Sequence, residues 1–131
     1  MTYFISGHRD LTQFEFDKYY IPKISKVLDD DPNADFVIGD WEGCDKMALE
    51  FLLSQPIYNF ITVYYVDYVH IKPFGADITN FENVYVKRRN NYNECDASMT
   101  HDSDFDIAWI RPGKENSHTS KNIDRRYYGK V

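Results

Sequence analysis

Three short segments of the chain place glycine beside polar and charged side chains, a combination suited to binding or transforming a small molecule. They read Ser-Gly-His-Arg-Asp at 6–10, Gly-Asp-Trp-Glu-Gly-Cys-Asp at 39–45 and Arg-Pro-Gly-Lys-Glu-Asn-Ser-His-Thr-Ser at 111–120. Each segment follows a short apolar run. Loops that follow buried strands carry a large share of binding and catalytic residues, so these segments are the first candidates for a functional site.

The first segment offers a hydroxyl, an imidazole and a fixed positive charge beside a glycine. Gly7 lets the backbone approach a ligand closely, because it has no side chain. Ser6 and His8 can exchange hydrogen bonds with that ligand, and Arg9 can bind a phosphate through two parallel hydrogen bonds. The alternative interpretation is a surface turn with solvated polar residues.

The second segment combines a predicted helix start with acidic side chains. Gly39 and Gly43 flank that start, where unpaired N–H groups favour an anion. The carboxylates of Asp40, Glu42 and Asp45 oppose a bare phosphate, however, and suit ribose hydroxyls or general-base catalysis better. We therefore take Asp40 and Asp45 as candidate catalytic residues. Gly39, Glu42 and Gly43 are candidate ligand-binding residues. A capped helix start is the alternative.

The third segment is the best candidate for a phosphate cradle. The hydroxyl residues Ser117 and Thr119 lie at a predicted helix start, with basic side chains nearby. Arg111, Gly113 and His118 complete the candidate ligand-binding set of this segment. The string G-x-x-x-x-G-K-[ST] is absent, so the segment is not a P-loop.

Apolar runs alternate with segments of helical spacing along the chain. Strands are predicted at 2–6, 34–38, 59–66 and 106–110. Helices are predicted at 11–28, 40–54, 84–99 and 118–128, the first kinked or split at Pro22, and 67–82 is predicted to be a long loop. The pattern predicts an α/β fold: a single Rossmann-like three-layer domain over residues 1–131, with a mostly parallel sheet of about four to five strands. Because parallel strands end at one edge of a sheet, the three segments should meet there.

Composition and charge exclude several classes of protein. The 131 residues have a net charge of −6, and basic residues gather only locally, at 87–89 and 121–126. A nucleic-acid-binding domain normally carries a basic stripe, so nucleic acid is not an expected partner. No apolar run approaches the roughly 20 residues of a membrane span, so we expect no membrane association.

The two cysteines, Cys44 and Cys95, lack the spacing of metal ligands. No signal peptide is visible, so both are expected to be reduced thiols of a cytoplasmic protein. The helix start could lower the pKa of Cys44, with simple packing as the alternative. The histidines are scattered along the sequence, and we expect neither a metal nor another cofactor.

Three stretches, 3–9, 37–48 and 104–126, resemble in order a broad superfamily of Rossmann-like proteins. It contains the nucleoside 2-deoxyribosyltransferases, the cytokinin-activating phosphoribohydrolases once called lysine decarboxylases, and small predicted nucleotide sensors. The resemblance implies a site for a nucleoside, a nucleotide or an ADP-ribose-like molecule. The base and sugar would lie near the first two segments and a phosphate near Ser117 and Thr119. Relatives with this fold are often dimers or larger, so a homo-oligomer is expected.

The chain departs from the catalytic members at positions that carry their chemistry. Those members have a glycine before the Thr and a Glu three residues after it, where this chain has His118, Thr119 and Asn122. The phosphoribohydrolases also carry an Arg four residues before a Met; against Met99 that position is Cys95. An asparagine cannot act as a carboxylate nucleophile or base. We therefore place Asn122 among the ligand-binding candidates.

Three hypotheses remain open from the sequence. The first is a non-catalytic, sensor-like domain that binds a nucleotide-derived molecule. The second is an enzyme of N-glycosidic bonds, a deoxyribosyltransferase or a hydrolase, in which Asp40 or Asp45 supplies the carboxylate that such chemistry needs. The third is a protein-interaction module, with the tyrosine-rich stretch 58–68 as its interface.

Overall fold

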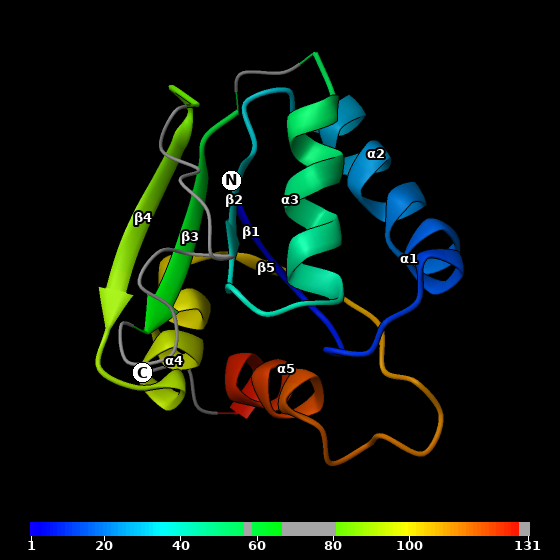
Figure 1. The fold of residues 1–131 in the computed structure, drawn as a ribbon, viewed down its shortest axis with the longest axis vertical. Coiled ribbons are helices and arrows are strands. Elements are labelled where there is room, and N and C mark those ends of the chain that lie inside the picture. The colour runs from blue at the N-terminus through cyan, green and yellow to red at the C-terminus, as the bar shows by residue number, and fades with distance from the viewer. Residues whose placement is uncertain (57–58, 67–80, 129–131) are drawn as a thin grey trace.

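The computed structural model describes residues 1–56, 59–66 and 81–128. They form a Rossmann-like α/β fold built on one five-stranded sheet in the order β4-β3-β2-β1-β5, in which every neighbouring pair is parallel (Figure 1). The strands are β1 (Thr2–Ser6), β2 (Asp35–Ile38), β3 (Ile61–Val66), β4 (Val84–Arg89) and β5 (Phe105–Ala108). The helices are α1 (Gln13–Tyr19), α2 (Ile21–Asp30), α3 (Cys44–Ser54), α4 (Tyr92–Asp102) and α5 (His118–Tyr128).

Side chains from both faces of the strands are buried, which is why the strands read as continuous apolar runs. In β1, Ile5 packs with the helices α1, α2 and α3, whereas its neighbour Phe4 packs with α4 on the opposite face. The same alternation divides Phe36 and Ile38 from Val37 in β2. The result is three layers, with α1–α3 on one side of the sheet and α4 and α5 on the other (Figure 1).

The order of the strands places a crevice at the carboxyl end of β1. From β1 the chain steps to β2, β3 and then β4 in one direction, and after α4 it returns to pair β5 with the other side of β1. Right-handed crossovers in opposite directions put their helices on opposite faces of the sheet. A reversal of this kind leaves a crevice above the strand ends, the usual ligand site of open α/β sheets.

The predicted helix 11–28 is split in two, as Pro22 required. Thr12 caps α1: its hydroxyl accepts the Glu15 N–H at 3.1 Å, and the Glu15 carboxylate accepts the Thr12 N–H at 3.0 Å. The helix α2 then begins at Ile21, with Pro22 in its first turn. That position tolerates proline, because the N–H groups of a first turn have no partner within the helix.

The helix predicted at 84–99 is wrong for its first half. Residues 84–89 form the edge strand β4, which pairs with β3 over its whole length, and the helix α4 begins only at Tyr92. Asn91 caps α4 by accepting the Glu94 N–H at 2.9 Å, and the Glu94 carboxylate accepts the Asn90 N–H at 2.9 Å. The asparagines that weaken helical propensity therefore mark the boundary between two elements.

The last helix is fixed to the sheet by a half-buried ion pair. Arg126 donates two hydrogen bonds to the Asp106 carboxylate, at 2.8 and 3.0 Å, and two more to Ser103. The network joins α5 to β5, and each carboxylate oxygen of Asp106 accepts one hydrogen bond from Arg126 in a bidentate geometry. It thereby holds the last turn of α5 against β5. Within the described part of the chain, no helix has the length and apolar composition to cross a membrane.

Candidate functional site

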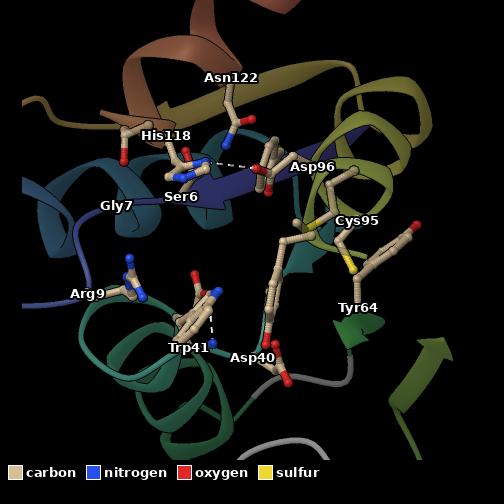
Figure 2. Close-up of a pocket in the computed structure, with 16 residues that line it drawn as sticks. Ser6, Gly7, Arg9, Asp40, Trp41, Tyr64, Cys95, Asp96, His118 and Asn122 are labelled. Carbon is tan, nitrogen blue, oxygen red and sulfur yellow. Dashed lines mark hydrogen bonds and ion pairs between the residues drawn. The ribbon is translucent and has the colours of Figure 1, made fainter. Parts of the chain in front are cut away.

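A cavity of about 310 Å³ lies at the carboxyl ends of β1, β2 and β3, on the face covered by α4 and α5 (Figure 2). Its walls come from six elements or the loops that follow them. Its lining residues are Phe4, Ser6, Gly7, Arg9, Gly39, Asp40, Trp41, Asp45, Tyr64, Tyr92, Cys95, Asp96, Met99, His118, Thr119 and Asn122. We call this the main cavity.

Acidic residues form one wall of the main cavity. The backbone N–H of Trp41 donates to the Asp45 carboxylate at 3.1 Å. A Cβ at Gly39 would lie 2.7 Å from Asp45 Oδ2, so a side chain there would displace this carboxyl group from its present position. Burial, reinforced by the charges of Asp40 and Asp96, raises the pKa of Asp45 to about 8. Asp45 is therefore protonated in much of the protein at neutral pH and can donate a hydrogen bond or a proton.

A stack of three side chains joins three loops at the cavity. The Arg9 guanidinium lies 4.3 Å from the centroid of the Trp41 ring, and the Trp41 and Tyr92 rings are 4.7 Å apart. Arg9 follows β1, Trp41 follows β2, and Tyr92 begins α4. Cation–π and aromatic contacts of this kind are each worth about 0.5–1.5 kcal/mol, so the stack holds the loops in a common arrangement.

An ion pair connects α4 and α5 beside the cavity. The Nδ1 atom of His118 lies 3.6 Å from a carboxylate oxygen of Asp96, as the dashed line in Figure 2 shows. Burial raises the pKa of Asp96, while the charges of His118 and Arg125 act in the opposite direction. Asp96 is thus the third carboxyl group facing the main cavity, and its charge depends on the groups around it.

Residues of β1 and α5 form another part of the cavity wall. Ser6, Thr119 and Asn122 are buried polar residues that line it. Arg125 donates a hydrogen bond of 2.8 Å to the side-chain oxygen of Asn122. The Ser6 hydroxyl is buried and has no hydrogen-bond partner among the described residues.

A second hollow of about 600 Å³ adjoins the main cavity. Gly7, Arg9, His118 and Thr119 line both, so the two spaces share a wall. The second hollow is otherwise formed by the loop after β1 and the segment that precedes α5. That segment brings Lys114 and the first turn of α5 to it, where Ser117 caps the Ser120 N–H at 3.2 Å.

The structure brings most of the sequence-predicted candidates to these two spaces. Ser6, Gly7, Arg9, Gly39, Asp40, Asp45, His118, Thr119 and Asn122 line the main cavity, and His8, Gly113 and Ser117 line the second hollow. Glu42, Gly43 and Arg111 are not among the lining residues described for either space.

The side chain of Arg111 is held by carboxylates instead. It forms ion pairs with Asp10 at 2.9 Å and with Glu15 at 2.7 Å, and this pairing lowers the pKa of Glu15 to about 2. Gly43 acts through its backbone, because it is the N-cap residue of α3 and packs against the backbone of Arg9. Both residues therefore shape the loops around the site.

Several lining residues were missed by sequence reasoning. Tyr92, Asp96 and Tyr64 line the main cavity, and the first two fell inside a predicted helix that ran too far toward the N-terminus. The Asn-Asn pair at 90–91 was the signal for a helix start there. Cys44 does not have the lowered pKa that its position suggested, because complete burial raises it.

His8 links the first and third segments and should make stability depend on pH. Its Nε2 accepts the Arg111 N–H at 2.9 Å. Burial, and then the charge of Arg111, lowers the pKa of His8 from its ordinary 6.5. The neutral ring is therefore favoured in the folded state, so its contribution is full above pH 6.5 and is lost as the pH falls through the native pKa.

We expect this contribution to amount to about 1 kcal/mol, the worth of one hydrogen bond. Urea unfolding of the wild type and of His8→Gln, at neutral pH and near pH ~5, measures it. Glutamine keeps an acceptor but does not titrate. The wild type should lose more stability on acidification than the variant, and equal losses would contradict the assignment.

Comparison of the chain with protein-family models, with curated proteins and with solved structures gives no match. The site must therefore be interpreted from its own geometry. Within the described residues, no group of three or more His, Cys, Asp or Glu side chains is arranged to hold a metal ion. What the site does present is an aromatic and acidic cavity beside a hollow with a basic and helix-capping wall.

Proposed function

We propose that this protein binds a nucleoside or a nucleotide-derived small molecule across the two adjoining spaces. The observation that carries the proposal is their shared wall, formed by Gly7, Arg9, His118 and Thr119. On one side of it lie aromatic rings and carboxyl groups, and on the other lie Lys114 and the start of α5. A molecule with an apolar ring, a sugar and a phosphate presents matching groups in the same spatial order.

The main cavity suits the nucleoside part. Its volume falls within the roughly 300–1,000 Å³ typical of small-molecule sites. Tyr64, Met99 and Phe4 offer apolar contact for a base, and the carboxyl groups of Asp40 and Asp45 suit sugar hydroxyls. A phosphate would fit the second hollow better, because Lys114 and the first turn of α5 attract negative charge whereas the acidic wall repels it.

Binding without chemistry is the function that the geometry supports best. The side chain at 122 is an amide, which cannot act as a carboxylate nucleophile. Burial also raises the pKa of the Cys95 thiol to about 12, so this sulfur is not a ready nucleophile at neutral pH. A regulatory or sensor-like role fits this proposal. We extend it to a cytoplasmic location on the strength of the cysteine pattern, and to a homo-oligomer on the strength of the sequence resemblance.

The protonated state of Asp45 favours one further candidate, an enzyme that cleaves or transfers N-glycosidic bonds. Such a reaction needs a general acid for the departing base and a carboxylate near the anomeric carbon. With a pKa of about 8, Asp45 can donate the proton, and Asp40 lines the same cavity. The nucleoside 2-deoxyribosyltransferases and nucleotide hydrolases are the corresponding activities.

Native mass spectrometry tests the proposal. The protein is incubated with nucleosides, 2′-deoxynucleosides, their monophosphates, NAD and ADP-ribose, and free base is measured in the same samples. We expect an intact retained ligand without released base, and the masses also give the oligomeric state. Released base would establish the enzyme instead.

Two variants locate the bound molecule. Trp41→Ala should weaken binding about tenfold or more, since it removes the ring that Arg9 and Tyr92 contact. Asp124→Asn, on the exposed surface of α5, should leave it unchanged. If the wild type retains no member of the panel, the proposal fails and a protein-interaction module becomes the better hypothesis. Of the tyrosine-rich stretch predicted for such an interface, 58 and 67–68 lie outside the described residues.

A further inference from the structure

The hydrogen bond between Arg125 and Asn122 determines which end of the Asn122 amide faces the main cavity. A guanidinium carries only donors, so it must face the amide oxygen. The Arg125 nitrogen lies 2.8 Å from Asn122 Oδ1. The amide NH₂ therefore points the other way, and Figure 2 shows the nitrogen of Asn122 directed into the cavity. Asn122 is only 4% exposed, so this donor has little bulk water to bind.

A second polar group of the main cavity is the buried hydroxyl of Ser6. Ser6 is 5% exposed, and its hydroxyl has no hydrogen-bond partner among the described residues. Both Ser6 and Asn122 line the main cavity. Buried polar groups without partners are rare in folded proteins, because each costs about 1–3 kcal/mol. The buried Ser6 hydroxyl and the inward-facing NH₂ of Asn122 are therefore both directed at an atom supplied from outside.

The charges around these two groups restrict what that atom is. Asp40, Asp45 and Asp96 all contribute carboxyl groups to the same cavity. Arg125 faces Asn122 and also acts electrostatically on Asp96, so part of its charge is already balanced. A phosphate placed here would meet these acidic groups in a partly buried space, at a high electrostatic cost. An uncharged acceptor avoids that cost.

We propose that Asn122 and Ser6 form a specificity subsite that donates hydrogen bonds to an uncharged acceptor on the nucleoside part of the ligand, with Arg125 as the positioning residue that fixes the amide. The acceptor is a carbonyl oxygen or ring nitrogen of the base, or an oxygen of the sugar. The inference rests on the proposed function, and it adds that the protein is the hydrogen-bond donor and the ligand the acceptor in one contact. It also gives the amide at 122 a role of its own, since a carboxylate here would present an acceptor to the ligand.

Affinity measurements on Asn122→Asp test the polarity of the subsite. The carboxylate keeps an oxygen for Arg125 but turns a second oxygen, instead of NH₂, toward the cavity. Binding of adenosine, guanosine, cytidine and uridine and of their 5′-monophosphates is titrated calorimetrically for the wild type and the variant. We expect those that bind the wild type to bind the variant about 10–100-fold more weakly.

The comparison of each nucleoside with its monophosphate locates the acceptor. The same loss for both members of a pair places the acceptor on the nucleoside part, as proposed. A loss confined to the monophosphate would place a phosphate there and overturn the inference. Unchanged affinity in Asn122→Asp would overturn the inference while leaving the proposed function intact. If no compound binds the wild type, the proposed function fails and the subsite falls with it.

A double-mutant cycle tests the positioning role of Arg125. Arg125→Met should weaken binding about 2–5-fold by letting the amide rotate, and this effect should vanish in an Asn122→Ala background. Arg125→Lys, which keeps a donor and the charge near Asp96, should restore most of the affinity. An equal effect of Arg125→Met in both backgrounds would show that Arg125 acts elsewhere. The side-chain amide signal of Asn122 in ¹⁵N NMR, shifted by ligand in the wild type, provides a readout that a purely structural role would not move.

Discussion

Gly43→Ala should destabilise the protein by about 4 kcal/mol or more, a drop of roughly 15 °C in melting temperature. The backbone at this position has φ +76° and ψ −125°, a conformation that is essentially restricted to glycine. A Cβ would also lie against the carbonyl oxygen of Arg9 and 2.6 Å from that of His8. The His8 carbonyl group cannot move easily, because its oxygen already accepts the N–H groups of Leu11 and Cys44.

Gly113→Ala is the matched control for this substitution. Gly113 also has a positive φ, +88°, but a Cβ there would meet no atom within 4 Å. The control therefore retains the cost of the backbone conformation alone, about 1–2 kcal/mol. The difference between the two variants in the free energy of unfolding, from thermal or urea unfolding, measures the cost of a side chain where the two strand-end loops approach closely. Equal losses would mean that this contact contributes nothing to stability.

Much of the fold follows from the period of the apolar residues. The strands 2–6, 35–38 and 61–66 are buried on both faces, and such strands give continuous apolar runs that short-range patterns detect well. The segment 84–89 behaves differently because it is an edge strand, in which only Val84 is buried and the last three residues are charged. A basic, half-exposed strand next to a helix lacks the continuous apolar run by which a buried strand is recognised in a sequence. Its pairing with β3 depends on contacts far apart in the sequence.

The location of the candidate site was easier to predict than its contacts. Topology alone brings the ends of β1, β2 and the start of α5 to one edge, so the glycine-containing segments meet there. Sequence spacing could not show that Arg111 would be taken by Asp10 and Glu15, since these ion pairs span about 100 positions in the chain. Nor could it show that Asp96 would face the cavity, because the length of its helix was overestimated.

Asp45→Asn should make the fold more stable at alkaline pH and should not do so at acidic pH. The pKa of Asp45 is about 8, against an ordinary value of 3.8, because burial disfavours the ionised carboxyl group. The folded state therefore holds a proton that the unfolded chain releases, and stability falls as the pH rises between these values. The variant has no such proton. We expect a gain of ~2–4 kcal/mol near pH 8, which is less than the full linkage value because the carboxyl borders a cavity, and close to none near pH 4.

Urea unfolding of both proteins at these two pH values measures the gain, with Asp124→Asn on the exposed surface of α5 as the control. A gain of the same size at both pH values would contradict the proposed protonation.

The same variant also tests function, because the amide of Asp45→Asn cannot donate or accept a proton as the carboxyl group does. Weaker ligand binding or lost base release, together with higher stability at alkaline pH, would show that Asp45 acts in the site. It would also show that this carboxyl group lowers the stability of the fold. If stability rises and binding and base release are both unchanged, the carboxyl group has no part in the function proposed for this cavity.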